Sequence, residues 1–336
     1  MPVLRRPAVS VPFALTVGLA LLAGCGTSDP ADVPSAAAQA PGYPVSLDNC
    51  GTDVEVEAVP QRIVTVKQSV TEMVLALGRG DALVGQAFPD GPYADAWAEQ
   101  AADVPELAPM MPSSEAVLDL EPDLVYAGWE SAFAADAVGG RDRLQQLGVT
   151  TYVSPSACKD DAYQPDRLTF EDVFAEIIEA GDVLGAPDAA ADLVAGQREE
   201  LAQVPDAGQG RTALWWSSGA DAPYVGGDIG APAMIMRQVG LENVFADIDD
   251  TWGTAGWEQV VDRDPDVIVL VDATWNTAAS KIEALRANPA TAALPAVLEG
   301  RFVTVAFPTT EAGVRNVEAA QTIADQLAQL PAAGQR

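Results

Sequence analysis

The feature that most constrains the fold of this chain is a short segment that occurs twice. Residues 115–125 have the sequence EAVLDLEPDLV, and residues 258–268 have the sequence EQVVDRDPDVI. Glu, Val, Asp, an acid, Pro and Asp coincide in the same order and at the same offsets. Each copy has the pattern of a short helix that continues through Pro-Asp into a buried strand. Chance repetition is the alternative in a chain rich in Asp, Val and Pro, but so many ordered matches predict two related α/β lobes that face each other.

Strand-like and helix-like patterns alternate through most of the chain. Apolar, β-branched runs predict strands at residues 63–66, 83–86, 124–127, 151–153, 213–216, 267–271 and 302–307. Helical periodicity lies between them at residues 71–77, 141–147, 234–239 and 281–287, and a long helix is expected near the C-terminus. This alternation is typical of parallel α/β sheets.

The middle of the chain differs, because it has two helical patterns with no strand between them. Thr169 and Asp172 have the spacing of a capping box at the start of the first helix. Gly185 and Pro187 end that helix and begin the next. A helix over residues 188–204 would be about 25 Å long, enough to join two lobes rigidly. We therefore expect an N-terminal α/β lobe at residues 43–167, a helical linker at 168–205 and a C-terminal α/β lobe at 206–332.

The N-terminus has the features of an export signal with a lipid attachment site. A short basic region precedes an apolar stretch that is too short to span a bilayer comfortably as a permanent helix. The stretch ends in LAGC at residues 22–25, which resembles the bacterial lipobox, in which the Cys is diacylated. An ordinary signal peptide that contains a Cys is the alternative. We expect a signal peptide at residues 1–24, lipidation of Cys25, a flexible tether at 25–42, and attachment to the outer face of the cytoplasmic membrane through the lipid alone.

Two further cysteines, Cys50 and Cys158, remain in the exported part of the chain. An even number of cysteines outside the cytoplasm predicts one disulfide bond. Closing a loop of about 100 residues would stabilise the fold by ~4–5 kcal/mol. Two free buried thiols are the alternative.

Charge and histidine content exclude several classes of function. The chain has 18 Lys and Arg against 49 Asp and Glu, and its net charge of −31 repels the phosphates of nucleic acids and anionic membranes. Histidine is absent, which excludes Ser-His-Asp and Cys-His triads and removes the commonest metal ligand. No G-x-S-x-G, P-loop or dinucleotide-binding motif is present. We expect no cofactor, no metal site and no enzymatic activity, with a lipid-anchored enzyme or surface receptor as the alternatives.

The expected strand ends supply candidate ligand-binding residues. Ligands of open α/β sheets bind outside the carboxyl ends of the strands, so two facing lobes would form a cleft there. Aromatic faces suit a flat conjugated ligand, and cationic side chains suit a phosphate or carboxylate. The candidates, each of which could instead be a core or rim residue, are Lys67, Trp129, Tyr224, Trp275 and Arg315. We expect them to converge on one mouth in a protein that captures a solute for a membrane importer.

Several motifs resemble a known family. They are YPVSLDNCG at residues 43–51, VPQRIV at 59–64, TE at 71–72 with LALG at 75–78, EPDLV at 121–125, and the central helix. Over about residues 43–332 the chain resembles the solute-binding proteins of ABC importers for ferric siderophores and cobalamin. The resemblance implies two Rossmann-like lobes bridged by one long α-helix, the class III periplasmic-binding-protein fold. It also implies a monomer whose partners are a small molecule and the permease and ATPase subunits of an importer.

The resemblance also implies how such a protein would dock. In that family one Glu on each lobe contacts Arg residues of the permease, and the matching positions are Glu115 and Glu258, one in each copy of the repeat. Two exposed carboxylates on opposite lobes would give a charge-assisted, two-point contact. Alternatively, each Glu only favours a helix N-terminus.

A second set of motifs resembles an actinobacterial subgroup of this family. They are FPDGP at residues 88–92, YAGWES at 126–131, SPSAC at 154–158, WSSG at 216–219, DATWNT at 272–277 and EAGVRN at 311–316. Members of the subgroup are proposed to bind the precursor of a deazaflavin hydride-carrier coenzyme, which is flat and carries a phosphodiester and a carboxylate. The resemblance implies this ligand, and a ferric siderophore or a corrinoid is the alternative.

Overall fold

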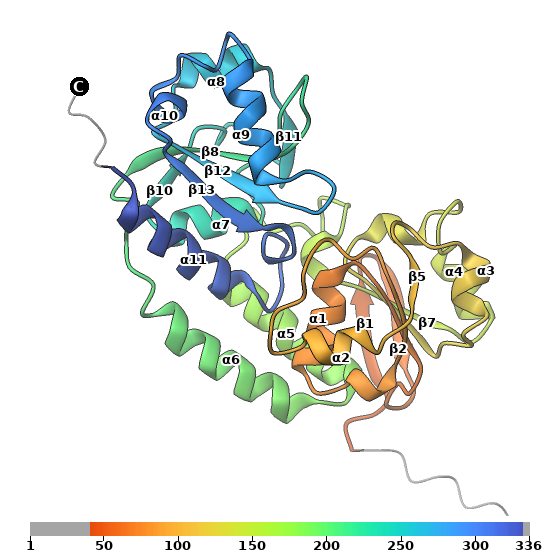
Figure 1. Cartoon of the computed structure of the whole chain (residues 1–336). Coiled ribbons are helices and arrows are strands. Elements are labelled where there is room, and N and C mark those ends of the chain that lie inside the picture. The colour runs from red at the N-terminus through yellow and green to blue at the C-terminus, as the bar shows by residue number, and fades with distance from the viewer. Residues whose placement is uncertain (1–40, 332–336) are drawn as a thin grey trace, which may run out of the picture. The chain divides into compact units, whose positions relative to one another are not determined.

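In the computed structural model, which describes residues 41–331, the two copies of the repeat occupy equivalent places in two sheets (Figure 1). Helix α3 (Ser114–Leu118) leads through Pro122 into β6 (Leu124–Ala127), and α8 (Trp257–Arg263) leads through Pro265 into β12 (Val267–Asp272). The expected signal peptide, Cys25 and most of the tether lie outside the described residues.

The two copies also share an unusual backbone conformation. The acid before each proline is left-handed, with φ of 46° at Glu121 and 40° at Asp264. A residue before proline is disfavoured in the right-handed helical region, so neither helix continues through this acid. Helix α3 ends at Leu118 and α8 ends at Arg263, and the chain then turns into the strand. The shared conformation supports the interpretation that the two lobes are related, which stays a prediction.

Each repeat also bonds to the neighbouring strand through its Pro-Asp carboxylate. Asp123 accepts a hydrogen bond from the backbone N–H of Arg62 at 3.0 Å, directly before β3 (Ile63–Val66). Asp266 accepts one from the backbone N–H of Thr212 at 3.1 Å, in β8 (Arg211–Ser218). The carboxylate therefore aligns the central strand of each lobe with its partner.

The N-terminal lobe contains the predicted parallel sheet. Its strand order is β5-β4-β3-β6-β7, and every pairing is parallel. An antiparallel hairpin of two additional strands precedes it. The remaining elements are β1 (Val45–Asn49), β2 (Thr52–Val56), β4 (Leu83–Ala87), β5 (Glu106–Ala108), β7 (Thr150–Val153), α1 (Gln68–Ala76), α2 (Ala98–Ala102) and α4 (Arg141–Gln146).

The C-terminal lobe contains a mixed sheet rather than a purely parallel one. Its order is β11-β9-β8-β12-β13, with β10 pairing to β8. The pairings of β9 with β8 and with β11 are antiparallel, because β9 follows β8 through a short turn. The remaining elements are β9 (Tyr224–Gly226), β10 (Leu241–Asn243), β11 (Trp252–Thr254), β13 (Phe302–Ala306), α7 (Ala231–Gln238), α9 (Ala278–Ala287), α10 (Pro295–Leu298) and α11 (Asn316–Gln329).

Helices α5 (Phe170–Leu184) and α6 (Pro187–Leu201) connect the lobes. The predicted capping box is confirmed, since the Thr169 and Asp172 side chains each accept a hydrogen bond from the other's backbone N–H. The start of α5 is tied to the C-terminal lobe, where the N–H of Leu168 donates to the carbonyl of Ile229 at 2.7 Å. Its end is tied to the N-terminal lobe through Arg79, which donates to the Leu184 carbonyl at 2.9 Å.

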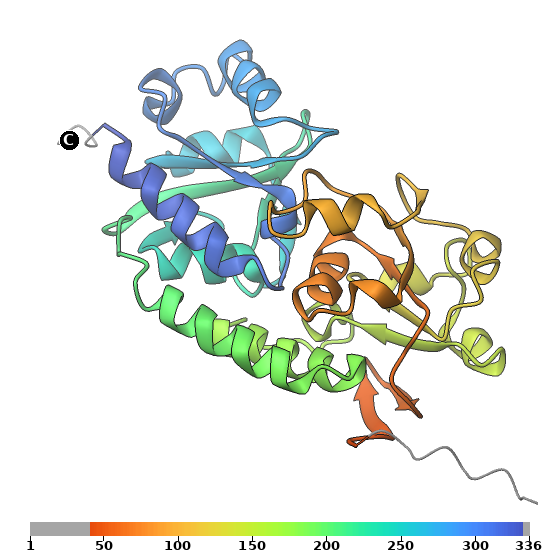
Figure 2. The same ribbon diagram turned by 60° about the horizontal axis from the view of Figure 1, so that its bottom comes forward.

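The chain then returns along α6 into the C-terminal lobe, and Figure 2 shows the helix passing along both lobes. The predicted fold of two α/β lobes and a bridging helix is confirmed. The domain boundaries at residues 43–167, 168–205 and 206–332 stay our proposal. No helix within residues 41–331 combines the length and apolar character that crossing a membrane requires.

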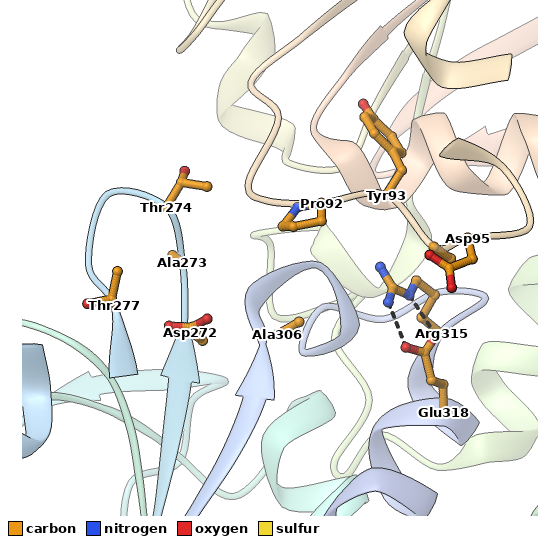
Figure 3. A pocket seen from close by; sticks show the side chains of 11 residues that line it. Pro92, Tyr93, Asp95, Asp272, Ala273, Thr274, Thr277, Ala306, Arg315 and Glu318 are labelled. Carbon is orange, nitrogen blue, oxygen red and sulfur yellow. Dashed lines mark hydrogen bonds and ion pairs between the residues drawn. The ribbon is translucent and has the colours of Figure 1, made fainter. Parts of the chain in front are cut away.

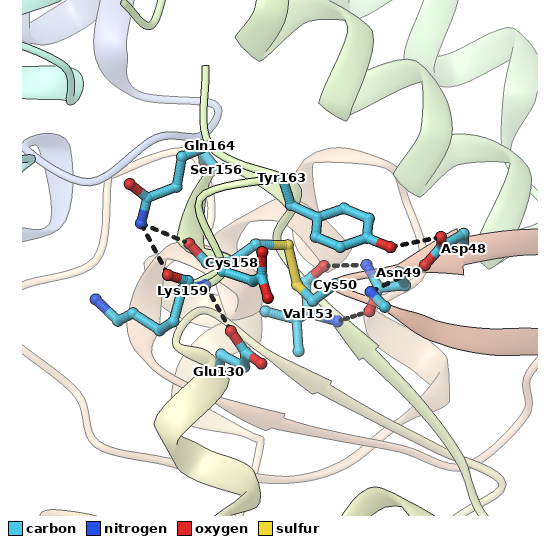
Figure 4. The surroundings of a disulfide bond; sticks show 12 residues. Asp48, Asn49, Cys50, Glu130, Val153, Ser156, Cys158, Lys159, Tyr163 and Gln164 are labelled. Carbon is cyan, nitrogen blue, oxygen red and sulfur yellow. Dashed lines mark hydrogen bonds between the residues drawn. A yellow bond between two sulfur atoms is a disulfide. The ribbon is translucent and has the colours of Figure 1, made fainter. Parts of the chain in front are cut away.

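The predicted disulfide between Cys50 and Cys158 is present (Figure 4). It joins the turn between β1 and β2 to the segment that follows β7. Beside it, the Asn49 side chain accepts from the N–H of Val153 and donates to the carbonyl of the same residue, both at 2.8 Å. The hairpin is therefore fastened to the edge of the N-terminal sheet.

Candidate ligand-binding site

A cavity of about 680 Å³ lies between the lobes, at the carboxyl ends of their strands. Its wall includes residues that follow β4, β6 and β7 in one lobe and β8, β12 and β13 in the other. Small-molecule sites commonly have volumes of ~300–1,000 Å³, lined by apolar and aromatic side chains with a few polar groups. The cavity has the size and the position of a ligand site.

Three aromatic pairs dominate the cavity wall. They are Phe88 with Trp129, edge to face at 5.3 Å between ring centroids, Trp275 with Phe307, edge to face at 5.6 Å, and Tyr224 with Trp252, stacked at 5.8 Å. All three predicted aromatic residues therefore line one cavity. Phe88, Phe307 and Trp252 were missed from the sequence, because aromatic residues near strand ends are as often core as site.

The segment after β6 brings Trp129 close to the other lobe. A Cβ atom on Gly128 would lie 2.9 Å from Ser69 Oγ and 3.0 Å from Lys67 Cβ, so only glycine lets the chain pass there. The Trp129 indole N–H then donates to Oε1 of Glu311, in the C-terminal lobe, at 2.6 Å. The ring is thereby fixed at the junction of the lobes.

The loop after β12 presents Trp275, which is half-exposed at 51%. Asp272 Oδ1 accepts from the N–H of Ala278 at 2.6 Å and closes the loop. From α9, the buried Lys281 side chain donates to the carbonyls of Val271 and Asn276. Burial lowers the pKa of Lys281 to about 8. A well-anchored loop thus holds an exposed aromatic ring at the mouth of the cavity.

Lys67 lies behind the cavity wall. Its side chain is fully buried, and Nζ is 2.6 Å from Asp90 Oδ1 and 3.8 Å from Glu311 Oε1. Three aromatic rings of the cavity lie 3.9–4.8 Å from the same ammonium. Burial, followed by the Glu311 carboxylate, raises the pKa of Asp90, and Lys67 lowers it in part. The charge of Lys67 is already matched by protein groups.

The backbone of Lys67 is strained. Its φ of 91° and ψ of 141° lie near a region that residues other than glycine seldom adopt. The position is fixed because its N–H donates to the carbonyl of Ala87 at 3.0 Å while its side chain pairs with Asp90. Such strain persists only where the surroundings determine it, and it concentrates at functional sites.

Arg315 lines a second cavity, of about 590 Å³, also between the lobes (Figure 3). It is buried and pairs with Glu72 at 3.0 Å and with Glu318 at 2.6 Å. Burial raises the pKa of Glu72, and Arg315 offsets part of this. The structure thus brings the three predicted aromatics together and places both predicted cations outside their cavity wall. Ligand contact by these five residues stays a prediction.

Glu311 is a site residue that the sequence did not single out. It lines the first cavity, and its carboxylate accepts from Ser69 Oγ at 3.1 Å and from Trp129 at 2.6 Å. Together with the Arg315–Glu72 pair, it connects the loop after β13 to the N-terminal lobe. Because the chain has 49 Asp and Glu residues, its sequence gives no reason to select Glu311 as a site residue.

Glu115 and Glu258 occupy equivalent, exposed positions in the first turns of α3 and α8. Neither carboxylate forms an ion pair with another described residue. Both are free to contact a partner, and their role in docking stays a proposal. Across residues 41–331, no group of three or more acidic, Cys or His side chains is arranged to hold a metal ion.

Comparison with known proteins identifies the family. Residues 63–309 match the family model described as periplasmic binding protein. The chain belongs to the periplasmic binding protein family. The resemblance found in the sequence is confirmed at this level.

Named relatives of the family come from several organisms. The chain is 30% identical over 197 residues to an uncharacterised ABC transporter substrate-binding lipoprotein, YvrC, of Bacillus subtilis, covering 57% of this chain and 56% of that protein. It is 28% identical over 271 residues to a cobalamin-binding protein of Halobacterium salinarum, covering 79% of this chain and 68% of that one. The chain therefore spans little more than half of the first relative and about two thirds of the second.

A solved structure of the family supports the fold. The chain matches an ABC-type Fe3+-hydroxamate transport system protein from Saccharomonospora viridis with a TM-score of 0.74 and 25% identity. That match covers 84% of this chain and 99% of the other. Both lobes and the helical linker are therefore common to this periplasmic binding protein and its solved relative.

Proposed function

We propose that this periplasmic binding protein is the extracytoplasmic substrate-binding subunit of an ABC importer. It would capture a planar or chelated anionic molecule between its lobes and deliver the molecule unaltered to the permease and ATPase subunits. The observation that carries this proposal is the interlobe cavity with its three aromatic pairs. Relatives named for ABC transport, cobalamin binding and Fe3+-hydroxamate transport support it.

For the ligand we favour the deazaflavin coenzyme precursor. Rings in edge-to-face and stacked pairs offer broad aromatic faces, which suit a flat conjugated ring system. Only two of the described residues that line the cavity carry charge, so most of the ligand should be uncharged or shielded. A ferric siderophore or cobalamin, carried by the same class of importer, is the alternative.

Titration of tryptophan fluorescence tests the ligand assignment. The mature protein is titrated separately with the deazaflavin precursor, with cyanocobalamin and with a ferric hydroxamate. We expect saturable 1:1 quenching by the precursor, because Trp129, Trp252 and Trp275 line the cavity. Trp275→Ala should weaken binding about tenfold or more, since a stacked ring contributes ~1–3 kcal/mol. Trp97→Phe, which lies outside the cavity wall, is the control.

Two outcomes would contradict the assignment. If cyanocobalamin or the ferric hydroxamate binds saturably and the precursor does not, the ligand assignment is wrong and the proposed role in an importer stands. Binding that Trp275→Ala and Trp97→Phe affect equally means that the interlobe cavity is not the site.

We also propose docking through Glu115 and Glu258. Two exposed carboxylates on opposite lobes can each form a charge-assisted contact with a permease arginine. Glu115→Ala with Glu258→Ala should abolish stimulation of the transporter ATPase and leave ligand affinity unchanged. A matched control, Glu55→Ala with Glu283→Ala, removes the same charge from two other exposed sites. Full stimulation by the first double variant rules this docking role out.

The anchor is proposed to be the diacylated Cys25, followed by the tether at residues 25–42. Two acyl chains hold a protein stably on a membrane, whereas one chain does not. Cys25→Ala should move the protein from the membrane fraction to the medium or periplasm of its host. Retention of this variant in the membrane fraction would contradict lipidation at that residue.

A further inference from the structure

Lysine is scarce in this chain, and the three lysines have very different environments. Lys67 and Lys281 are 0% and 1% exposed, and protein groups accept hydrogen bonds from both ammoniums. Lys159 is exposed and lines the cavity between the lobes. The only lysine side chain within residues 41–331 that solvent reaches freely is therefore at the ligand site.

The backbone of Lys159 is held from several sides (Figure 4). It follows Cys158 directly, so the disulfide to Cys50 ties it to the hairpin. Its N–H donates to Glu130 Oε2 at 2.6 Å, and its carbonyl accepts from Gln164 Nε2 at 3.4 Å. The position of the residue at the rim is thus set by covalent and hydrogen-bonded contacts.

The ammonium of Lys159 has no ion-pair partner among the described carboxylates. Figure 4 shows its side chain extending away from the Glu130 carboxylate. Arg263 and Arg315 are paired with acids, whereas the exposed Arg143 and Arg286 form no ion pair with a described residue. Of these unpaired cations, Lys159 is the one that lines the cavity. An unpaired cation in so acidic a protein is available to an anion from outside.

The charged residues of the cavity wall leave one place where the negative group of a ligand can bind. Lys159 and Glu311 are the only charged residues among the described ones that line it. Glu311 is already bonded to Trp129 and Ser69 and lies near Lys67. An anionic group of a ligand would be repelled at Glu311 and attracted at Lys159.

We propose that Lys159 receives the phosphate or carboxylate group of the ligand at the rim, while the aromatic pairs hold its flat part. This rests on the proposed function and assigns the anion-binding role to a residue other than Lys67 or Arg315. The Cys50–Cys158 disulfide acts as the positioning element, because it fixes the backbone that carries Lys159.

A matched pair of probes tests the proposal. One is the deazaflavin precursor, and the other is its ribitol core, which has the same chromophore and lacks the phosphodiester and carboxylate. Lys159→Met should weaken binding of the precursor about tenfold, the effect of one charge-assisted hydrogen bond. Binding of the core should change less than about twofold, since no ionic contact is lost. Lys159→Arg should restore most of the affinity for the precursor.

The control is Arg143→Gln, which removes one exposed positive charge outside the cavity wall. It should leave the affinities for both probes unchanged. Acetylation by an N-hydroxysuccinimide ester, followed by mass spectrometry, gives a second readout. Bound precursor should slow the acetylation of Lys159 at least fivefold, and bound core should not.

The outcomes separate this proposal from the proposed function. The role of Lys159 is overturned if Lys159→Met binds the precursor as tightly as the wild type, or if its affinity for both probes falls by the same factor. The ligand assignment stands in either case. If the wild type binds neither probe, the ligand assignment and this proposal fall together.

Discussion

Removing the Glu311 carboxylate should open the two lobes. The Glu311 carboxylate accepts hydrogen bonds from the Trp129 indole at 2.6 Å and the Ser69 hydroxyl at 3.1 Å, and Lys67 Nζ lies 3.8 Å from Glu311 Oε1. All three partners belong to the N-terminal lobe, whereas Glu311 follows β13 in the C-terminal lobe. Glu311→Ala therefore removes contacts that exist only while the lobes are together.

The size of the effect follows from these contacts. A hydrogen bond to a charged group contributes ~1.5–3 kcal/mol and a second, longer one about 1 kcal/mol, so the loss is ~2.5–4 kcal/mol. At about 1.4 kcal/mol per factor of ten, the ratio of closed to open molecules should fall by about 60- to 700-fold. Glu311→Gln keeps an acceptor oxygen and loses only the charge, so its effect should be smaller.

Small-angle X-ray scattering of the ligand-free proteins measures this opening. The radius of gyration should increase in the order wild type, Glu311→Gln, Glu311→Ala, and acrylamide should quench Trp129 more strongly in the same order. Identical scattering from wild type and Glu311→Ala, with unchanged quenching, would refute the claim that this carboxylate holds the lobes together.

Two further predictions concern stability. Replacing both Cys50 and Cys158 with Ser removes a covalent link between residues 108 apart in the sequence. In the chain-entropy model this should lower the free energy of unfolding by about 5 kcal/mol. Urea denaturation followed by tryptophan fluorescence measures the change, and a loss below about 1 kcal/mol would contradict the prediction. Glu176 is buried in α5, its Oε1 has no hydrogen-bond partner among the described residues, and burial raises its pKa to about 7. Because the folded state then binds a proton that the unfolded state has released, this carboxyl costs stability as the pH rises from about 4.5 to about 7, and the loss is complete above that range. Glu176→Gln should therefore be more stable than the wild type by roughly 3 kcal/mol at pH 8 and nearly equal to it in stability at pH 4.5. Urea unfolding at both pH values measures this difference. A difference in stability that does not vary with pH would show that Glu176 does not titrate in this range.

Those parts of the fold that depend on local chemistry could be predicted from the sequence. The Pro-Asp repeat predicted one interior strand in each lobe, β6 and β12, and strands β3 and β6 begin and end where expected. Thr169 and Asp172 form the expected cap, and Cys50 and Cys158 form the expected disulfide. Each of these rests on a short-range pattern or on pairing by elimination.

Features that depend on tertiary contacts could not be predicted in this way. Strands β9 and β11 have three residues each, too few for a period of two to be recognised, so the antiparallel edge of the second sheet was missed. The left-handed backbone at Lys67 places its side chain behind the cavity wall, against Asp90. A sequence pattern shows that Lys67 follows a strand, but it does not give the φ angle that sets the direction of the side chain.

For one site residue a signal was present and not used. Lys159 is one of three lysines in a chain of net charge −31, and it follows a cysteine that was expected to form a disulfide. A rare cation held next to a covalent link is a stronger candidate than a cation beside a strand, because its backbone is already fixed. Since Lys67 is also one of the three lysines, the neighbouring cysteine is the feature that distinguishes Lys159 from it.

The most direct test of this account is native mass spectrometry of the mature protein purified from its own host. We expect one small molecule bound noncovalently per chain, released intact on denaturation, with the mass and fluorescence of a deazaflavin precursor. Trp275→Ala protein isolated in the same way should carry much less of it. A molecule that is released chemically changed, or one that Trp275→Ala retains in full, would contradict a protein that binds its ligand reversibly between two lobes.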